Sequence, residues 1–206
     1  MADFTVSTDI DTFLQSADNA AARDSLGVIN YPYTTDFISG VEQTRNLTSI
    51  TSSDGYTYNS NLTSIYVGSN VTSIGGNAFS NCQSLTSATI GNSVTSIGSY
   101  AFYYCSGLTS ITIPDRVTTL GAYAFQGCTS LTSIIIPDSV TSIGSAAFYF
   151  CSSLATLNCL ATTAPTLDTS GAGGAFDNIA ASDIHVPVGA TGYGTTYGGL
   201  TVVADL

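Results

Sequence analysis

The sequence has no lysine, and its only basic side chains apart from one histidine are Arg23, Arg45 and Arg116. Charged residues make up 8% of the 206 positions, whereas soluble proteins contain about a quarter. Thirteen aspartates and one glutamate bring the formal net charge to −11. A protein that binds phosphate backbones needs clustered cations to displace counterions. The composition therefore argues against nucleic acid and anionic membrane surfaces as partners.

The sequence also lacks the patterns typical of a secretory signal peptide and of a membrane-spanning helix. The first residues, Met1 to Phe4, show neither the positive region nor the apolar region of a signal peptide. No apolar run reaches the roughly 18 residues that a spanning helix needs. We therefore expect a chain that is made in the cytoplasm and does not insert into a membrane.

What the sequence does contain is a repeat. Four blocks of 23 residues align without gaps, and they cover residues 62–84, 85–107, 108–130 and 131–153. Each block opens with apolar residues at its first, fourth and sixth positions, separated by threonine and serine, which suits a half-buried strand. Glycine or proline followed by a polar residue then ends the strand. Because one coil cannot bury its own apolar face, the blocks predict a stacked solenoid with a shared core.

The second half of each block has two fixed features. A glycine recurs at one corner, as Gly75, Gly98, Gly121 and Gly144, and we predict a left-handed backbone conformation there. An Ala-Phe-x-x-Cys motif closes the block. We predict that this motif forms one short helical turn that places its phenylalanine in the core.

The two ends of the chain depart from the repeat. Residues 31–61 are predicted to be a linker and a capping half-repeat, and residues 154–206 a degenerate repeat and a C-terminal cap. Within that cap, residues 184–193 predict a final strand and turn that cover the open edge of the solenoid. Residues 1–30 predict two short helices, which form an attachment segment through their apolar side chains. These side chains are Phe13, Leu14, Ala17, Ala21 and Leu26.

Two segments resemble known families. The consensus LTSITIPDSVTSIGxxAFxxCxS, over about residues 47–206, resembles the BspA-like leucine-rich repeat family of bacterial surface, phage and protist proteins. That resemblance implies a leucine-rich repeat solenoid, mainly β with short helical turns, but no particular ligand. The stretch from about residue 8 to 28, with its Ala-Ala-Ala-Arg-x-x-Leu-Gly ending, is similar to a segment of tail-fibre and other virion proteins of tailed phages. It implies attachment to a virus particle.

Candidate catalytic and metal-binding residues are few. Cys82, Cys105, Cys128 and Cys151 recur every 23 residues and Cys159 lies at an inward strand position, so we expect buried thiols, with disulfides between coils as the alternative. His185 lacks an adjacent nucleophile and is expected to be an exposed strand residue. Stacked Asp115 and Asp138 suit turn capping better than calcium binding. We expect no enzyme, cofactor or metal site.

Two surfaces remain as candidates for binding. Outward threonines and serines of the strands form a hydroxyl ladder, which runs from Thr63 and Ser64 through Thr86, Ser87, Thr89, Thr109, Ser110, Thr112 and Thr132 to Ser133. Aromatic residues beside the Ala-Phe pairs vary between the blocks and suit contact with glycan or a neighbouring subunit. They are Tyr100, Tyr103, Tyr104, Tyr123, Tyr149 and Phe150.

These features together predict a non-enzymatic phage virion protein that is held to other virion proteins by residues 1–30 and presents the solenoid for host-surface or glycan adhesion. Many copies on one particle would supply avidity, and a homo-oligomer is a candidate assembly. A capsid decoration or cement protein is the first alternative. A bacterial surface adhesin of the BspA type is the second.

Overall fold

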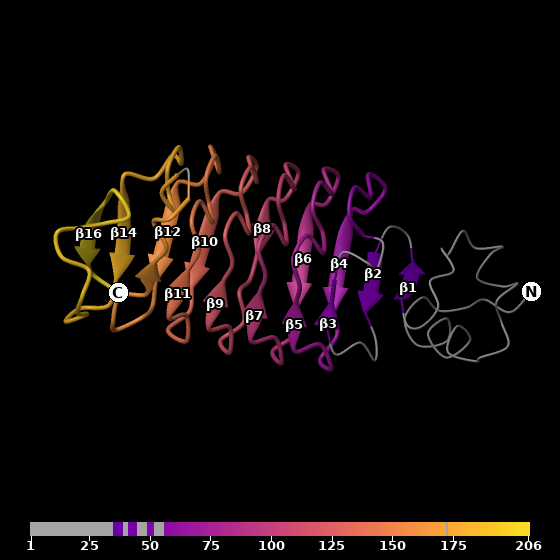
Figure 1. The fold of residues 1–206 in the computed structure, drawn as a ribbon, viewed down its shortest axis with the longest axis horizontal. Coiled ribbons are helices and arrows are strands. Elements are labelled where there is room, and N and C mark those ends of the chain that lie inside the picture. The colour runs from indigo at the N-terminus through magenta and orange to yellow at the C-terminus, as the bar shows by residue number, and fades with distance from the viewer. Residues whose placement is uncertain (1–34, 39–40, 45–48, 52–55, 172) are drawn as a thin grey trace, which may run out of the picture.

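The computed structural model describes residues 35–38, 41–44, 49–51, 56–171 and 173–206. These residues form coils that stack along one axis, as the sequence predicts (Figure 1). Strands and turns make up the described residues, and no helix occurs among them. No helix that could cross a membrane is found there either. The helices predicted within residues 1–30 lie outside the described part, together with the attachment residues Phe13, Leu14, Ala17, Ala21 and Leu26.

One long side of the solenoid is built from the strands that open each repeat. Neighbouring strands pair in parallel between residues 23 positions apart, as Ser87 does with Ser64. The isoleucines predicted to point inward are buried, and most of the hydroxyl residues between them are exposed. The strands on this side are β2 (Val41–Thr44), β4 (Ser64–Val67), β6 (Ser87–Ile90), β8 (Ser110–Ile111), β10 (Ser133–Ile136), β12 (Thr156–Cys159) and β14 (Asp183–Val186).

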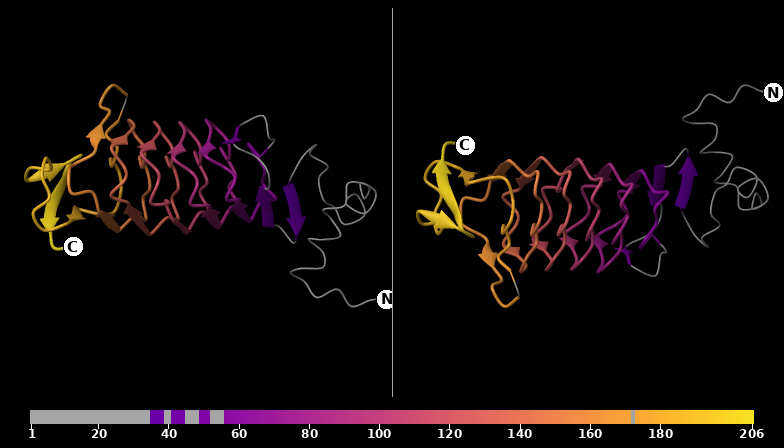
Figure 2. Two further views of the ribbon diagram at one scale, coloured as in Figure 1. Left: turned by 90° about the horizontal axis from the view of Figure 1, so that it is seen from below. Right: turned by 90° about the horizontal axis from the view of Figure 1, so that it is seen from above.

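The opposite side is a parallel sheet of six short strands. Each strand contributes one apolar residue to the core, for example Ile97 and Leu120, which are partners in the register. Figure 2 shows the two rows of strands facing each other across the core. The strands of this sheet are β3 (Ser49–Ile50), β5 (Ser73–Ile74), β7 (Ser96–Ile97), β9 (Thr119–Leu120), β11 (Ser142–Ile143) and β13 (Thr166–Leu167).

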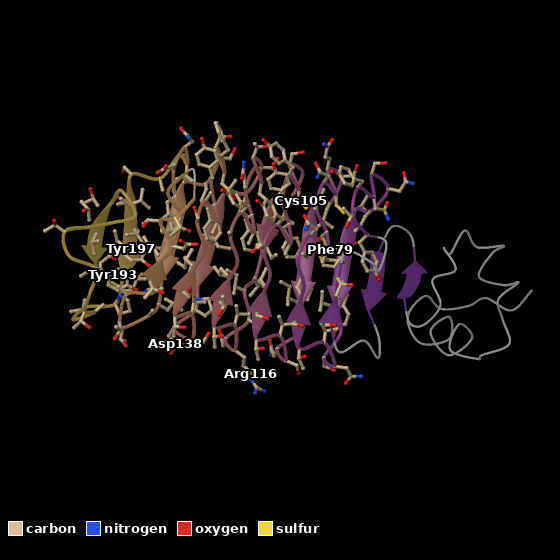
Figure 3. The ribbon with its side chains drawn as sticks, viewed as in Figure 1. Phe79, Cys105, Arg116, Asp138, Tyr193 and Tyr197 are labelled. Carbon is tan, nitrogen blue, oxygen red and sulfur yellow. The ribbon has the colours of Figure 1, made fainter. Side chains whose placement is uncertain are left out.

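Both ends of the first side carry an antiparallel pair. At the N-terminal end β1 (Thr35–Ile38) pairs with β2. At the C-terminal end β16 (Leu200–Ala204) adds in parallel to β14, and β15 (Thr196–Tyr197) turns back on β16. The strand predicted near Ile184 is therefore followed by two more. Tyr193 and Tyr197, labelled in Figure 3, fix this cap by donating hydrogen bonds to the carbonyls of Ala161 and Pro165 at 2.8 and 2.7 Å.

The Ala-Phe-x-x-Cys segments were expected to be helical turns, and this expectation is wrong. Alternate backbone N–H groups donate to the next coil, as those of Tyr100, Phe102 and Tyr104 do, and the others close tight turns. One residue within each segment and the residue just before the segment are left-handed, and such residues end an α-helix. The third side of the solenoid is thus a stack of hydrogen-bonded turns.

The recurring glycines were expected to have a positive φ, and this is also wrong: Gly75, Gly98, Gly121 and Gly144 are not among the left-handed residues. Their role is close packing between coils. A Cβ atom built on Gly98 would lie 2.8 Å from the carbonyl carbon of Gly75 and the nitrogen of Gly76. Any side chain at this corner would push neighbouring coils apart.

The core runs the length of the solenoid as columns of equivalent residues. Phe79, Phe102, Phe125, Phe148 and Phe176 form one column, with ring centroids 5.2 to 5.7 Å apart in near-parallel stacks. All five rings are buried. Stability therefore depends on contacts between neighbouring coils, as in other solenoids.

Candidate functional site

The candidate site lies on the turn side of the solenoid, on segments that we call arms. Each full arm runs from the residue before Ala-Phe to the cysteine: residues 77–82, 100–105, 123–128 and 146–151. The first and fifth residues of every arm are left-handed, with φ between 52° and 73°. Asparagine and glycine tolerate this conformation, and bulky side chains rarely adopt it. The arms nevertheless place aromatic residues at several of these positions.

Four of the six predicted contact residues form one cluster. The rings of Tyr100 and Tyr123 stack with centroids 4.8 Å apart and planes 11° apart. The Tyr103 ring makes edge-to-face contacts with the rings of Tyr100 and Tyr104, with centroids 5.3 and 4.6 Å apart. We call these four residues the tyrosine cluster. Because two successive arms, 100–105 and 123–128, contribute to it, the cluster is complete only when the coils are stacked.

The remaining two predicted residues, Tyr149 and Phe150, form a separate edge-to-face pair at 4.5 Å. Tyr104 and Phe150 are 40% and 46% exposed, while Tyr149 and the other members of the tyrosine cluster are half-buried. The six predicted aromatic residues thus lie on the arm side of the solenoid, and we call this surface the aromatic flank. Its role in binding stays a prediction.

Tyr58 belongs to the same surface and was missed. It is 73% exposed and has a φ of 62°, which corresponds to the fifth arm position one coil before Asn81. Burial, then the neighbouring phenols of Tyr104, Tyr100, Tyr58 and Tyr123, raise the pKa of Tyr103. This places Tyr58 within electrostatic reach of the cluster. The incomplete arm around residue 58 lacks the Ala-Phe motif, so the repeat alignment gave no signal for it.

A glycine-rich loop borders the flank at its C-terminal end. The Ser145 hydroxyl donates a hydrogen bond to the Gly173 carbonyl at 3.0 Å. A Cβ built on Gly171 would lie 3.1 Å from the Tyr123 hydroxyl, and one on Gly173 would lie 3.1 Å from the Tyr149 ring. Glycine at these two positions therefore lets the loop pack against the aromatic rings.

The hydroxyl ladder is used by the fold itself. The Thr86 hydroxyl donates to the Thr63 carbonyl at 2.9 Å, and the Thr109 hydroxyl donates to the Thr86 carbonyl at 3.0 Å. A second column repeats this bond across the coil, from Thr95 and Thr118 to the threonine one coil earlier. These bonds explain why threonine recurs at these positions without any ligand.

The cysteines are buried thiols, as expected. All five are free and 0% exposed, and four donate an S–H bond to a backbone carbonyl of the preceding coil, as Cys105 does to Phe79 at 3.0 Å. Burial raises the pKa of the Cys151 thiol to about 12 and that of Cys128 well above its usual value. Such thiols are poor nucleophiles because the thiolate is the reactive form.

Asp177 borders the flank, because the Phe150 N–H donates to the Asp177 carbonyl at 3.1 Å, whereas the histidine and aspartates that the sequence offered as candidates lie elsewhere. His185 lies in β14 with a half-exposed side chain, and its Nδ1 atom is 2.9 Å from an Asp205 carboxylate oxygen. Figure 3 shows Cys105 near the arm edge of the solenoid and Arg116 with Asp138 at the other edge. Among the described residues, no group of three or more histidine, cysteine or acidic side chains is arranged to hold a metal ion.

Comparison with known proteins agrees with the fold. The family model for the BspA type leucine rich repeat region matches residues 48–168 in six copies. A search of curated proteins found no match. A leucine-rich repeat protein from T. pallidum shares 23% identity with a TM-score of 0.54, and the match covers 61% of this chain and 68% of that one.

A second solved structure, a leucine-rich repeat protein from Bacteroides ovatus, is 26% identical with a TM-score of 0.56. The match covers 75% of this chain but 47% of the other, so the chain spans about half of that protein. The family model does not extend to residues 8–28, the segment similar to phage virion proteins. Because the family model covers more than half of its length, the chain belongs to the BspA-type leucine-rich repeat family.

Proposed function

We propose that this chain is a non-enzymatic recognition module that adheres to a biological surface through the aromatic flank of its arms. Leucine-rich repeat solenoids of this kind are generally binding scaffolds, and stacking produces an extended surface on which many weak contacts add up. The observation that carries the proposal is the tyrosine cluster. It gathers four phenols from two adjacent coils on one outer side, at positions where other arms also carry asparagine, serine, glutamine, glycine or alanine.

Tyrosine suits this role because its ring offers a large contact area with little side-chain entropy to lose, and its hydroxyl can both donate and accept hydrogen bonds. Each site would be weak, so several copies held close together would supply the avidity. The hydroxyl ladder is a poorer candidate because two of its threonines, Thr86 and Thr109, already donate to the preceding coil.

The test is binding of the fluorescently labelled chain, displayed in several copies, to intact bacterial and animal cells. Wild type is expected to bind one of these surfaces, and Tyr100→Ala together with Tyr104→Ala is expected to lose most of that binding. Tyr66→Thr is the matched control, because Tyr66 is an exposed tyrosine on the strand side and the next coil has Thr89 in its place. Equal binding by all variants would contradict the proposal.

The particle that carries the module is a second question. A phage virion, with attachment through residues 1–30, is supported by the likeness of residues 8–28 to tail-fibre proteins, and a bacterial surface adhesin is supported by family membership. Immunogold labelling separates these: label on phage tails supports the fibre, label on heads supports the decoration protein, and label on bacterial cells alone contradicts both virion hypotheses.

A further inference from the structure

The fifth position of the arms carries an aromatic ring in every second coil. Tyr58, Tyr104 and Phe150 are separated by small or polar residues, and all six positions are left-handed with φ between 52° and 73°. In chain order the column is Tyr58, Asn81, Tyr104, Gly127, Phe150 and Asn178. The three rings of this column are among the large apolar side chains that stay exposed, whereas the phenylalanines of the same arms are fully buried.

The alternation leaves room for the Tyr104 ring to lie along the solenoid. A Cβ built on Gly127 would lie 3.1 Å from the Tyr104 ring, so that ring covers the coil after its own. Coils stack at about 4.8 Å, and two coils therefore repeat at about 9.6 Å. Three rings two coils apart form a straight row about 19 Å long.

The backbone conformation at this position does not need an aromatic residue. Asparagine adopts the left-handed conformation at Asn81 and Asn178, and glycine at Gly127, with less steric cost than an aromatic residue. Strained residues that persist on a surface point to a function that uses them. The exposed row thus indicates a ligand with the same two-coil period.

The charges around the row define the chemistry of that ligand. Residues 56–60, 77–82, 100–105, 123–128 and 146–151, which carry the three rings, contain no charged side chain, and the corresponding segment of the following coil, at the C-terminal end of the row, has one, Asp177. The net charge of −11 repels anionic polymers. A ligand for this surface is uncharged, with apolar C–H faces for the rings and hydroxyl groups for the phenols and arm amides.

An extended, uncharged polysaccharide has these properties. In a ribbon-like β-linked chain every second sugar presents the same face, so equivalent faces recur once per disaccharide, on a scale close to two coils. We propose that Tyr58, Tyr104 and Phe150 form three platforms for an extended neutral glycan, with each ring holding every second sugar. This inference rests on the proposed function, since it names the ligand class of the same flank.

The experiment is calorimetric titration of the whole chain with neutral β-1,4-linked gluco- and xylo-oligosaccharides of two to six units. Binding is expected to strengthen with length up to the five or so units that reach all three rings. Maltohexaose, which coils, and an acidic oligogalacturonide are expected to bind at least tenfold more weakly. The hexasaccharide binding no tighter than the disaccharide would overturn the row.

The variants are Tyr58→Asn, Tyr104→Asn and Phe150→Asn, because asparagine is the natural residue of this column and keeps the backbone conformation. Each change is expected to weaken hexasaccharide binding by about tenfold, the loss of one stacking contact. Tyr66→Thr is expected to leave it unchanged. An affinity equal to that of wild type in all three variants would contradict the inference.

The two proposals fail separately. If wild type adheres to cells and the three variants do not, but no oligosaccharide binds, the partner is a protein: the glycan inference is wrong and the proposed function stands. If wild type binds neither cells nor oligosaccharide, both are wrong. Binding of oligosaccharide that the variants abolish supports both.

Discussion

The strand sides and the arm side of the same coils follow opposite rules. On the strand sides most residues repeat from coil to coil, apart from one outward position that carries Tyr66, Thr89 and Ile135 in different coils. Several threonine hydroxyls there donate to the preceding coil, as Thr109 does to Thr86. On the arms the buried Ala-Phe pair repeats, but the residues around it change, and aromatic side chains occupy left-handed positions. Repetition in this solenoid marks what stacking needs. Variation at a conformationally costly position marks what the fold does not explain.

The largest expected effect comes from two phenylalanines on the arm side. Phe125 is buried between Phe102 and Phe148, so Phe125→Ala is expected to lower the free energy of unfolding by about 3–5 kcal/mol. Phe150→Ala removes an exposed ring from a residue with a left-handed backbone, and it is expected to lower the free energy of unfolding by less than about 0.5 kcal/mol. Urea denaturation followed by circular dichroism measures both. Equal losses of unfolding free energy in the two variants would show that the buried and the exposed rings contribute alike to stability.

The second effect is a loss of stability at alkaline pH. Burial raises the pKa of Cys151 from 9.0 to about 12, so the folded chain keeps its proton where the unfolded chain releases it. The contribution is fully present below pH 9 and is lost as the pH rises towards 12, by up to about 1.4 kcal/mol per pH unit.

Denaturation at pH 8, 9, 10 and 11 measures this loss, with Cys151→Ala as the matched variant. The alanine variant is expected to have a flatter stability profile above pH 9, because one buried thiol no longer titrates. An unchanged slope would show that this thiol does not contribute. The other buried thiols, among them Cys105 and Cys128, are expected to keep part of the slope.

A gain in stability is expected at the flank. Tyr104→Asn places a residue suited to the left-handed conformation at φ 52° and is expected to raise the free energy of unfolding by about 1 kcal/mol. Gly127→Ala is the opposite control: it puts a Cβ at φ 73° and 3.1 Å from the Tyr104 ring, and it is expected to destabilise. A loss of stability in Tyr104→Asn would mean that the ring serves the fold.

The smallest effect belongs to the hydroxyl ladder. Thr109→Val keeps the shape of the side chain and removes its bond to the Thr86 carbonyl. Because this bond is exposed, we expect a loss of about 0.5 kcal/mol in urea denaturation and no change in surface binding. Loss of adhesion with stability intact would move the binding site to the strand side.

Much of the fold was predictable because the inward positions recur at fixed spacing. The spacing of Leu108, Ile111 and Ile113 predicts the strand and its buried face, and the period of 23 residues predicts the parallel register. The helical turn and the left-handed glycine were predicted wrongly. Local composition does not reveal bonds to the next coil, such as that from Phe102 to Ala124, or the close approach of Gly98 to Gly75.

The candidate site was predictable in part. Variation of the aromatic residues between blocks identified Tyr100 and Tyr104. The structure adds that the Tyr103 ring contacts both of them. Tyr58 was missed because its coil lacks the Ala-Phe motif, and the alternation with Asn81 and Gly127 was missed because the sequence does not reveal that this position has a positive φ. Backbone geometry therefore distinguished residues that the repeat pattern treats alike.

The most direct test of the account is cell-surface binding by the variant that combines Tyr58→Asn, Tyr104→Asn and Phe150→Asn, measured beside wild type at equal folded concentration. The account predicts that this variant unfolds at a higher urea concentration than wild type and no longer binds. A variant that is less stable and still binds would contradict it.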